Sequence, residues 1–194
     1  RHPGVAIHFV GHSNGTYMFG QSIQKVRTLR FDNVLLAGSV LPRDFDWTTL
    51  DDRQQIGALV NVCATKDKPV AWLCSGLRGL GMRDIGVGGF TGFDVTPPAA
   101  VQLLSIDGGH GAGLTSERLP AVARYVRTGT PPEGPTSLPS GLFGQVSRLA
   151  PYLFWLLLVG VLGAVAWAVI GFSAVKLAIV LGALLLIFLV LKVV

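Results

Sequence analysis

The sequence predicts an α/β fold, in which parallel strands alternate with helices, followed by two membrane-spanning helices. Short apolar runs bounded by turn residues alternate with longer stretches of mixed polarity, as in α/β domains. One such run leads through Gly-His-Ser-Asn-Gly into a helical pattern. Half of the 194 residues are hydrophobic, and most of the excess lies after Pro151. These three observations indicate one globular domain of ordinary size and a C-terminal membrane segment.

Four short apolar runs are the expected strands. Continuous apolar runs are typical of parallel strands that are covered on both faces. The stretches between them are long enough for right-handed crossover connections. We therefore expect about four neighbouring parallel strands at Val5–Val10, Asn33–Gly38, Ala58–Ala64 and Val101–Ile106.

Helices are expected in the segments between these strands. They cover Thr16 to about Leu29, a stretch that begins at Pro69, and Ser116, as a helix cap, to about Arg127. Residues 40–55 are polar and rich in turn residues, with room for one helical turn. Residues 76–92 contain seven glycines and predict a long flexible loop.

The segment Gly11-His12-Ser13-Asn14-Gly15 lies between the first strand and the first helix. A strand, a sharp turn with a serine and then a helix is the context of a nucleophile elbow. We expect Gly11 and Gly15 to prevent clashes in this strained turn, which exposes the Ser13 hydroxyl. Asn14 offers its backbone N–H as an oxyanion donor. His12 is expected to pack or hydrogen-bond beside the site.

A serine hydroxyl needs a base to take its proton, and the base needs an acid to hold its tautomer. His110 follows the fourth strand in a Gly-Gly-His-Gly turn, and Asp67 follows the third strand. Because the carboxyl ends of parallel strands meet at one edge, Ser13, Asp67 and His110 are expected to converge. Asp44 and Asp46, after the second strand, are rival acids.

On these residues the chain resembles the C-terminal half of an α/β-hydrolase, over about residues 5–127. The resemblance implies Ser13 as nucleophile, Asp67 as acid and His110 as base, in the order Ser, Asp, His along the chain. It also implies about four further strands and a second oxyanion donor upstream, which this sequence lacks. The chain starts at Arg1 and enters the first strand almost at once, so we expect it to be a piece of a longer protein.

The C-terminal part contains two apolar runs, about Leu149–Ile170 and Ala174–Val194, separated by a short turn. Each would form ~31 Å of helix at ~1.5 Å per residue, enough to cross the hydrocarbon core. Arg148 and Lys192 at one end of the hairpin favour a cytoplasmic catalytic domain. The expected organisation is an α/β domain at 1–128, a Pro/Gly/Ser-rich linker at 129–148 and a transmembrane hairpin at 149–194.

Charge and cysteine content exclude other classes. All 11 acidic residues and 13 of the 16 basic ones precede Arg148, so the first part carries a net charge near +2. No basic stripe is present, which argues against a nucleic-acid partner. Cys63 and Cys74 are too few for a disulfide framework and lack a second close ligand for zinc. We expect both to be small buried hydrophobes, and we expect no metal or cofactor.

The expected function is a membrane-anchored serine hydrolase that cleaves a small-molecule or lipid ester through an acyl-enzyme. Acyl transfer to an alcohol is a related outcome. The alternative is a catalytically inactive hydrolase-like scaffold or binding module at a membrane. We expect the isolated chain to be inactive, because the elbow strand would expose an unpaired edge.

Overall fold

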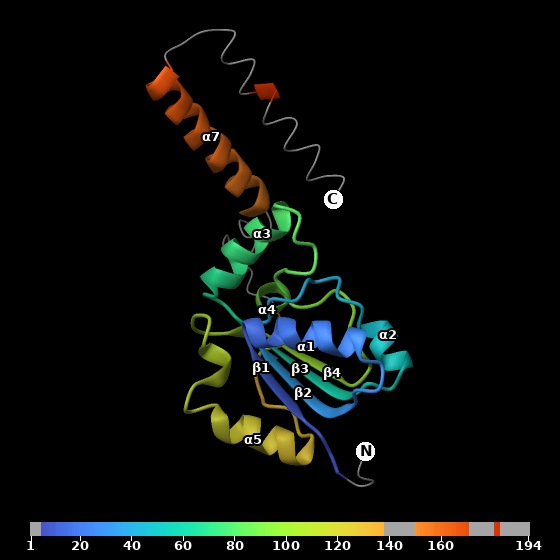
Figure 1. Ribbon diagram of the computed structural model, residues 1–194. Helices are drawn as coiled ribbons and strands as arrows, with labels where there is room; N and C mark the ends of the chain where they lie inside the picture. Colours follow the sequence, from blue (N-terminus) through green and yellow to red (C-terminus); the bar gives the residue numbers. More distant parts are fainter. Residues whose placement is uncertain (1–4, 138–149, 171–180, 183–194) are drawn as a thin grey trace.

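The computed structural model describes residues 5–137, 150–170 and 181–182. At its centre is a parallel sheet of four strands in the order β1-β2-β3-β4 (Figure 1). The predicted α/β class and the four parallel strands are confirmed. The strands are β1 (Phe9–His12), β2 (Phe31–Ala37), β3 (Ile56–Ala64) and β4 (Ala100–Ile106).

Helices connect the strands and cover the sheet on both sides (Figure 1). The longest described helix, α7 (Ala150–Ile170), contacts α3 and η1. The other elements are α1 (Asn14–Lys25), α2 (Trp47–Asp52), the π-helix η1 (Pro69–Cys74), α3 (Ser75–Gly79), α4 (Gly88–Thr91), the 3-10 turn η2 (Ala112–Leu114) and α5 (Leu119–Thr128).

The core forms two apolar layers, one on each face of the sheet. Successive side chains of a strand point to opposite faces. Val34 and Leu36 of β2 therefore pack with Phe19 and Ile23 of α1. Their neighbours Leu35 and Ala37 join the opposite layer, which contains Val122 and Tyr125 of α5. Because β2 and β3 are buried on both faces, their sequences are continuously apolar.

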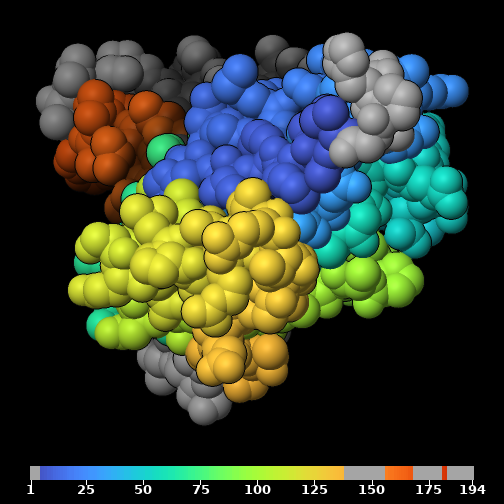
Figure 2. Space-filling model, turned by 90° about the horizontal axis from the view of Figure 1, so that it is seen from below, coloured from blue at the N-terminus to red at the C-terminus, as the bar shows by residue number. Residues whose placement is uncertain are grey.

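The first strand differs from the prediction. It spans Phe9–His12 rather than Val5–Val10, and it forms one edge of the sheet. Val5, Ile7 and Val10 are 65%, 47% and 41% exposed, so the expectation of a strand covered on both faces was wrong for β1. Figure 2 shows the N-terminal residues at the surface beside α5. The position of β1 at an edge agrees with the unpaired edge expected for the elbow strand. What the apolar run did not reveal is how far the faces of this strand are covered.

The glycine-rich stretch 76–92 is not the flexible loop that its composition predicted. It contains part of α3 and all of α4, and Gly86, Gly88 and Gly89 donate backbone hydrogen bonds to Val40, Leu41 and Ser39. A Cβ on Gly89 would lie 1.9 Å from the Ser39 nitrogen. These glycines allow two backbone segments to lie in contact.

The start of α5 and the residues that follow it also differ from the predictions. α5 is capped by Arg118, and the Ser116 cap was wrong by two residues. In the predicted linker 129–148, Pro135 accepts a hydrogen bond from the backbone N–H of Leu104, so part of it lies along β4. Residues 138–149 lie outside the described part of the chain.

The C-terminal apolar runs are only partly described. The first coincides with α7, and the second lies outside the described residues except for 181–182. Among the residues that the structure describes, no helix combines the length and apolarity required to cross a membrane. The transmembrane hairpin therefore stays a prediction.

The close approach at Gly89 leads to the first testable expectation. Gly89→Ala in the intact chain should lower the free energy of unfolding by about 1–3 kcal/mol, because the added methyl overlaps the Ser39 backbone. Gly111→Ala is the matched control, since a Cβ there meets nothing within 4 Å. Denaturant unfolding measures both. Equal stability of the two variants would contradict the packing argument.

Candidate functional site

Ser13 occupies a sharp turn between β1 and α1. Its φ of 52° and ψ of −126° fall in a region that residues with side chains rarely adopt. The Ser13 N–H donates to the Ala37 carbonyl at 3.2 Å, so the turn is fixed to the carboxyl end of β2. The side chain is partly exposed. This local geometry matches the strained, accessible serine that the sequence predicted.

Thr16 stabilises this turn. The Ser13 carbonyl accepts hydrogen bonds from the Thr16 N–H at 2.9 Å and from the Thr16 hydroxyl at 2.7 Å. The same hydroxyl accepts from the Val40 N–H and lies 3.3 Å from the Ser39 hydroxyl. Thr16 and Ser39 are both completely buried. The network offsets the strain at Ser13, and the sequence analysis missed both residues.

The two elbow glycines differ in what they do. A Cβ on Gly11 would come within 2.4 Å of the Phe9 ring, so this glycine is required for packing. A Cβ on Gly15 would meet nothing within 4 Å. The prediction that Gly15 prevents a clash is therefore wrong within the described residues. The physical reason is that Gly15 already lies in the first turn of α1, where a Cβ would point into open space.

The segments after β3 and β4 are joined by backbone hydrogen bonds. Thr65 N–H donates to the Ile106 carbonyl at 2.8 Å, and Lys66 N–H donates to the Gly108 carbonyl at 2.9 Å. This pairing continues the sheet register beyond the ends of the strands. The pairing brings Asp67, which follows Lys66, beside His110, which is two residues after Gly108.

Those two residues, Asp67 and His110, form a direct pair. The His110 Nδ1 lies 3.0 and 2.9 Å from the two Asp67 carboxylate oxygens. Asp67 is completely buried, whereas the His110 side chain is 24% exposed. The Val70 N–H also donates to Asp67 at 3.1 Å, so the buried carboxylate has two partners. When Nδ1 donates to Asp67, the neutral His110 presents Nε2 as a proton acceptor.

His12 and Gly38 bring His110 next to the elbow. The His12 Nε2 donates to the His110 carbonyl at 2.9 Å, and the two ring centroids are 4.5 Å apart. Gly38 has a φ of +53°, and a Cβ there would lie 3.0 Å from the His110 ring. Gly38 thus leaves space for the imidazole. The sequence predicted the place of His12 but assigned no role to Gly38, which appeared only as the end of an apolar run.

Ser13 and His110 are neighbours through His12, but the structure does not join them directly. Among the described residues, the Ser13 hydroxyl makes no hydrogen bond to His110. Catalytic hydrogen bonds are often long before substrate binds. Asn14 begins α1 and is exposed, so its N–H is one of the helix-terminal donors without an intrahelical acceptor. Asn14 therefore lies at the solvent-exposed, positive end of the dipole of α1.

Asp44 and Asp46, the two alternative acids, bind residues other than His110. Asp44 forms a bidentate ion pair with Arg78, with both distances at 3.0 Å. Asp46 caps α2 by accepting from the Thr49 N–H at 3.0 Å, and hydrogen bonds from the Thr49 side chain and from this N–H lower the pKa of its carboxyl group. Neither contacts His110. Geometry therefore favours Asp67 over both alternatives.

The two cysteines are buried and free, as expected. Burial raises the pKa of Cys63 to about 12 and that of Cys74 to about 11. A thiol with such a pKa contains almost no thiolate at neutral pH and is a poor nucleophile. In the described part of the chain, no cluster of three or more His, Cys, Asp or Glu side chains is suited to hold a metal ion.

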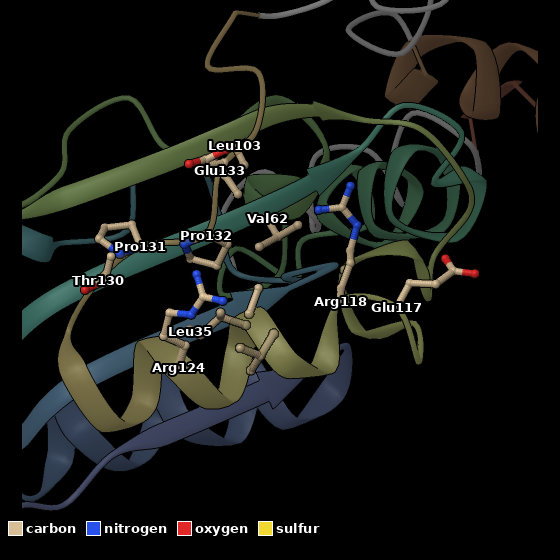
Figure 3. A pocket seen from close by; sticks show the side chains of 13 residues that line it. Leu35, Val62, Leu103, Glu117, Arg118, Arg124, Thr130, Pro131, Pro132 and Glu133 are labelled. Carbon is tan, nitrogen blue, oxygen red and sulfur yellow. The ribbon is translucent and has the colours of Figure 1, made fainter.

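A cavity of about 370 Å³ lies between α5, the sheet and residues 130–133 (Figure 3). Leu35, Val62 and Leu103 contribute apolar walls. Two arginines and two glutamates also line it, so the charges balance and favour neither an anion nor a cation. None of the predicted site residues lines this cavity.

Comparisons with protein-family models, with curated protein sequences and with solved structures find no significant match to this chain. The interpretation of the site therefore depends on the geometry of Ser13, His110 and Asp67 and on their chemistry.

Thr16 gives the second testable expectation. Thr16→Val keeps the shape but removes the hydroxyl that binds the Ser13 carbonyl and the Val40 N–H, which should cost about 1–3 kcal/mol of stability. Thr128→Val is the control, because the Thr128 hydroxyl is exposed. Thermal unfolding compares the variants. If Thr16→Val is as stable as Thr128→Val, the network does not stabilise the turn.

Proposed function

We propose that this chain carries the nucleophile, base and acid of a serine hydrolase that cleaves an ester. One observation carries the proposal: the His110 Nδ1 is hydrogen-bonded to the buried Asp67 carboxylate at 2.9 Å. The backbone of His110 is in turn hydrogen-bonded to His12, the residue before the strained Ser13. A buried carboxylate that fixes an imidazole tautomer leaves a base at Nε2. A solvated histidine of no catalytic importance would not need a buried acid.

In the proposed reaction, the Ser13 oxygen attacks the carbonyl carbon of the ester while His110 Nε2 takes the hydroxyl proton. The Asp67 carboxylate stabilises the imidazolium. The Asn14 N–H faces the oxyanion of the tetrahedral intermediate. The carbon–oxygen bond to the alcohol breaks, and the alcohol takes the proton from Nε2. Water then attacks the acyl-enzyme with the same base and releases the acid and Ser13.

The proposed class is an α/β-hydrolase of which this chain forms the C-terminal half. The parallel order β1-β2-β3-β4 and the positions of Ser13, Asp67 and His110 after β1, β3 and β4 support this assignment. The free edge of β1 is where further strands of the class would pair. A second oxyanion donor would come from that part, and for this reason we expect the isolated chain to be inactive.

The proposed location is a membrane, with the catalytic domain on the cytoplasmic side. The support is the apolar composition of α7 and of the run that follows it, with basic residues at one end. A membrane anchor makes a hydrophobic or lipid ester a plausible substrate, since such esters concentrate at membranes.

A second candidate is a hydrolase-like scaffold without activity that binds a partner at the membrane. The observation that favours it is the missing hydrogen bond between the Ser13 hydroxyl and His110 among the described residues. Activity of the serine decides between the two candidates.

The direct test is labelling of the complete, membrane-embedded protein with a fluorophosphonate probe. The Ser13 oxygen should displace fluoride from phosphorus and become covalently modified. Labelling should disappear in Ser13→Ala and in His110→Ala, and it should persist in Ser116→Ala, whose serine is exposed and far along the chain. Unlabelled but folded wild-type protein would favour the scaffold, and labelling that survives Ser13→Ala would refute the nucleophile.

Asp67 can be tested separately. Asp67→Asn keeps the size of the side chain but removes the charge and disturbs the tautomer of His110. We expect the labelling rate to fall by about 10²–10⁴-fold. Asp44→Asn, which alters the rival acid, should leave the rate within about twofold. A larger effect at Asp44 than at Asp67 would contradict the assignment of the acid.

A further inference from the structure

A second cavity, of about 660 Å³, lies between the segment η1–α3 and α7. Its volume is within the range of small-molecule sites, roughly 300–1,000 Å³. Among the residues that the structure describes, no charged side chain lines it. The lining residues are Trp72, Leu73, Gly76, Leu77, Leu80, Leu156 and Leu157.

The wall of this cavity is attached to the acid of the proposed triad. Asp67 accepts a hydrogen bond from the Val70 N–H with its side chain and one from the Ala71 N–H with its backbone carbonyl. Helical backbone then continues from Pro69 to Gly79. Trp72 is five residues after Asp67, or ~8 Å along a helix at ~1.5 Å per residue. In Figure 1, α3 and α7 extend from the end of the sheet where α1 begins.

The lining is suited to hydrocarbon and to little else. Leu73, Leu156 and Leu157 are 62%, 73% and 68% exposed, so apolar side chains face the opening of the cavity, where hydrocarbon from a substrate or from bilayer lipid would cover them favourably. Each methylene moved from water into such a site strengthens binding by about fourfold. A charged ligand would find no charged partner among these side chains, whose one polar group is the indole N–H of Trp72.

We propose that this cavity binds the acyl chain of a long-chain ester whose carbonyl is attacked by Ser13. The inference rests on the proposed function and narrows its substrate class. The carboxyl group of the ester lies at the triad, and the chain extends along η1 and α3 toward α7. A substrate with a short acyl group leaves the cavity unfilled and gains nothing from it.

The test is a series of fluorophosphonates that differ only in alkyl length, from ethyl to hexadecyl, used on the complete protein in membranes. The inactivation rate should rise at least tenfold along the series. Leu77→Trp and Leu80→Trp reduce the cavity and should lower the ratio of the hexadecyl rate to the ethyl rate to about one. Leu119→Trp places the same ring on an exposed position of α5, and it should behave as wild type.

The results separate the two proposals. If the ethyl reagent labels Ser13 but length has no effect, or the Trp variants keep the full rise, the acyl-chain site is refuted and the hydrolase stands. If no reagent labels Ser13, the hydrolase proposal fails.

A binding experiment tests the cavity without activity. A C16 fatty ester with a photoreactive diazirine in its chain, applied to Ser13→Ala protein, should cross-link to residues 72–80 and 156–157. The cross-links should be lost in Leu80→Trp and be competed by unlabelled C16 ester. Cross-links only elsewhere, or cross-links that added ester does not reduce, would overturn the inference; the latter would assign the cavity to bilayer lipid.

Discussion

The hydrogen bond between His110 and Asp67 is the interaction on which the site depends. A completely buried carboxylate is costly unless it is paired, and Asp67 is paired with His110 Nδ1 and the Val70 N–H. That pairing requires the ends of β3 and β4 to lie in register, which the bonds of Thr65 and Lys66 to the opposite segment ensure. The orientation of one imidazole thus depends on the order of the sheet.

The turn at Ser13 is the second constraint, and it is coupled to the first. Its strained backbone is held by the buried hydroxyl of Thr16, and its neighbour His12 binds the carbonyl of His110. Both ends of the site therefore contact the carboxyl end of β2, where Ala37 accepts from Ser13 and Gly38 leaves space for the imidazole. The open side of β1 lies next to this turn, so a segment that paired with that edge would also affect the position of Ser13.

The sequence predicted β2 and β3 well, because strands buried on both faces are continuously apolar, and it placed β4 within one residue of its observed start although most of β4 is only partly buried. It also predicted the convergence of Asp67 and His110, since residues after neighbouring parallel strands must meet at one edge. It could not predict that Gly89 lies against Ser39, because this contact depends on which segments are neighbours in space. Thr16 and Gly38 were missed for the same reason: each is an ordinary residue type until its partner is known.

We propose that Ser13, His110 and Asp67 act as one catalytic unit. Peptide mass spectrometry of the complete protein, after brief reaction with an activated ester and an acid quench, tests this proposal. We expect an acyl group on the peptide that contains Ser13, and we expect it to be absent in His110→Ala. An acyl group on another residue, or turnover of the ester with no adduct at Ser13 in any quench, would contradict it.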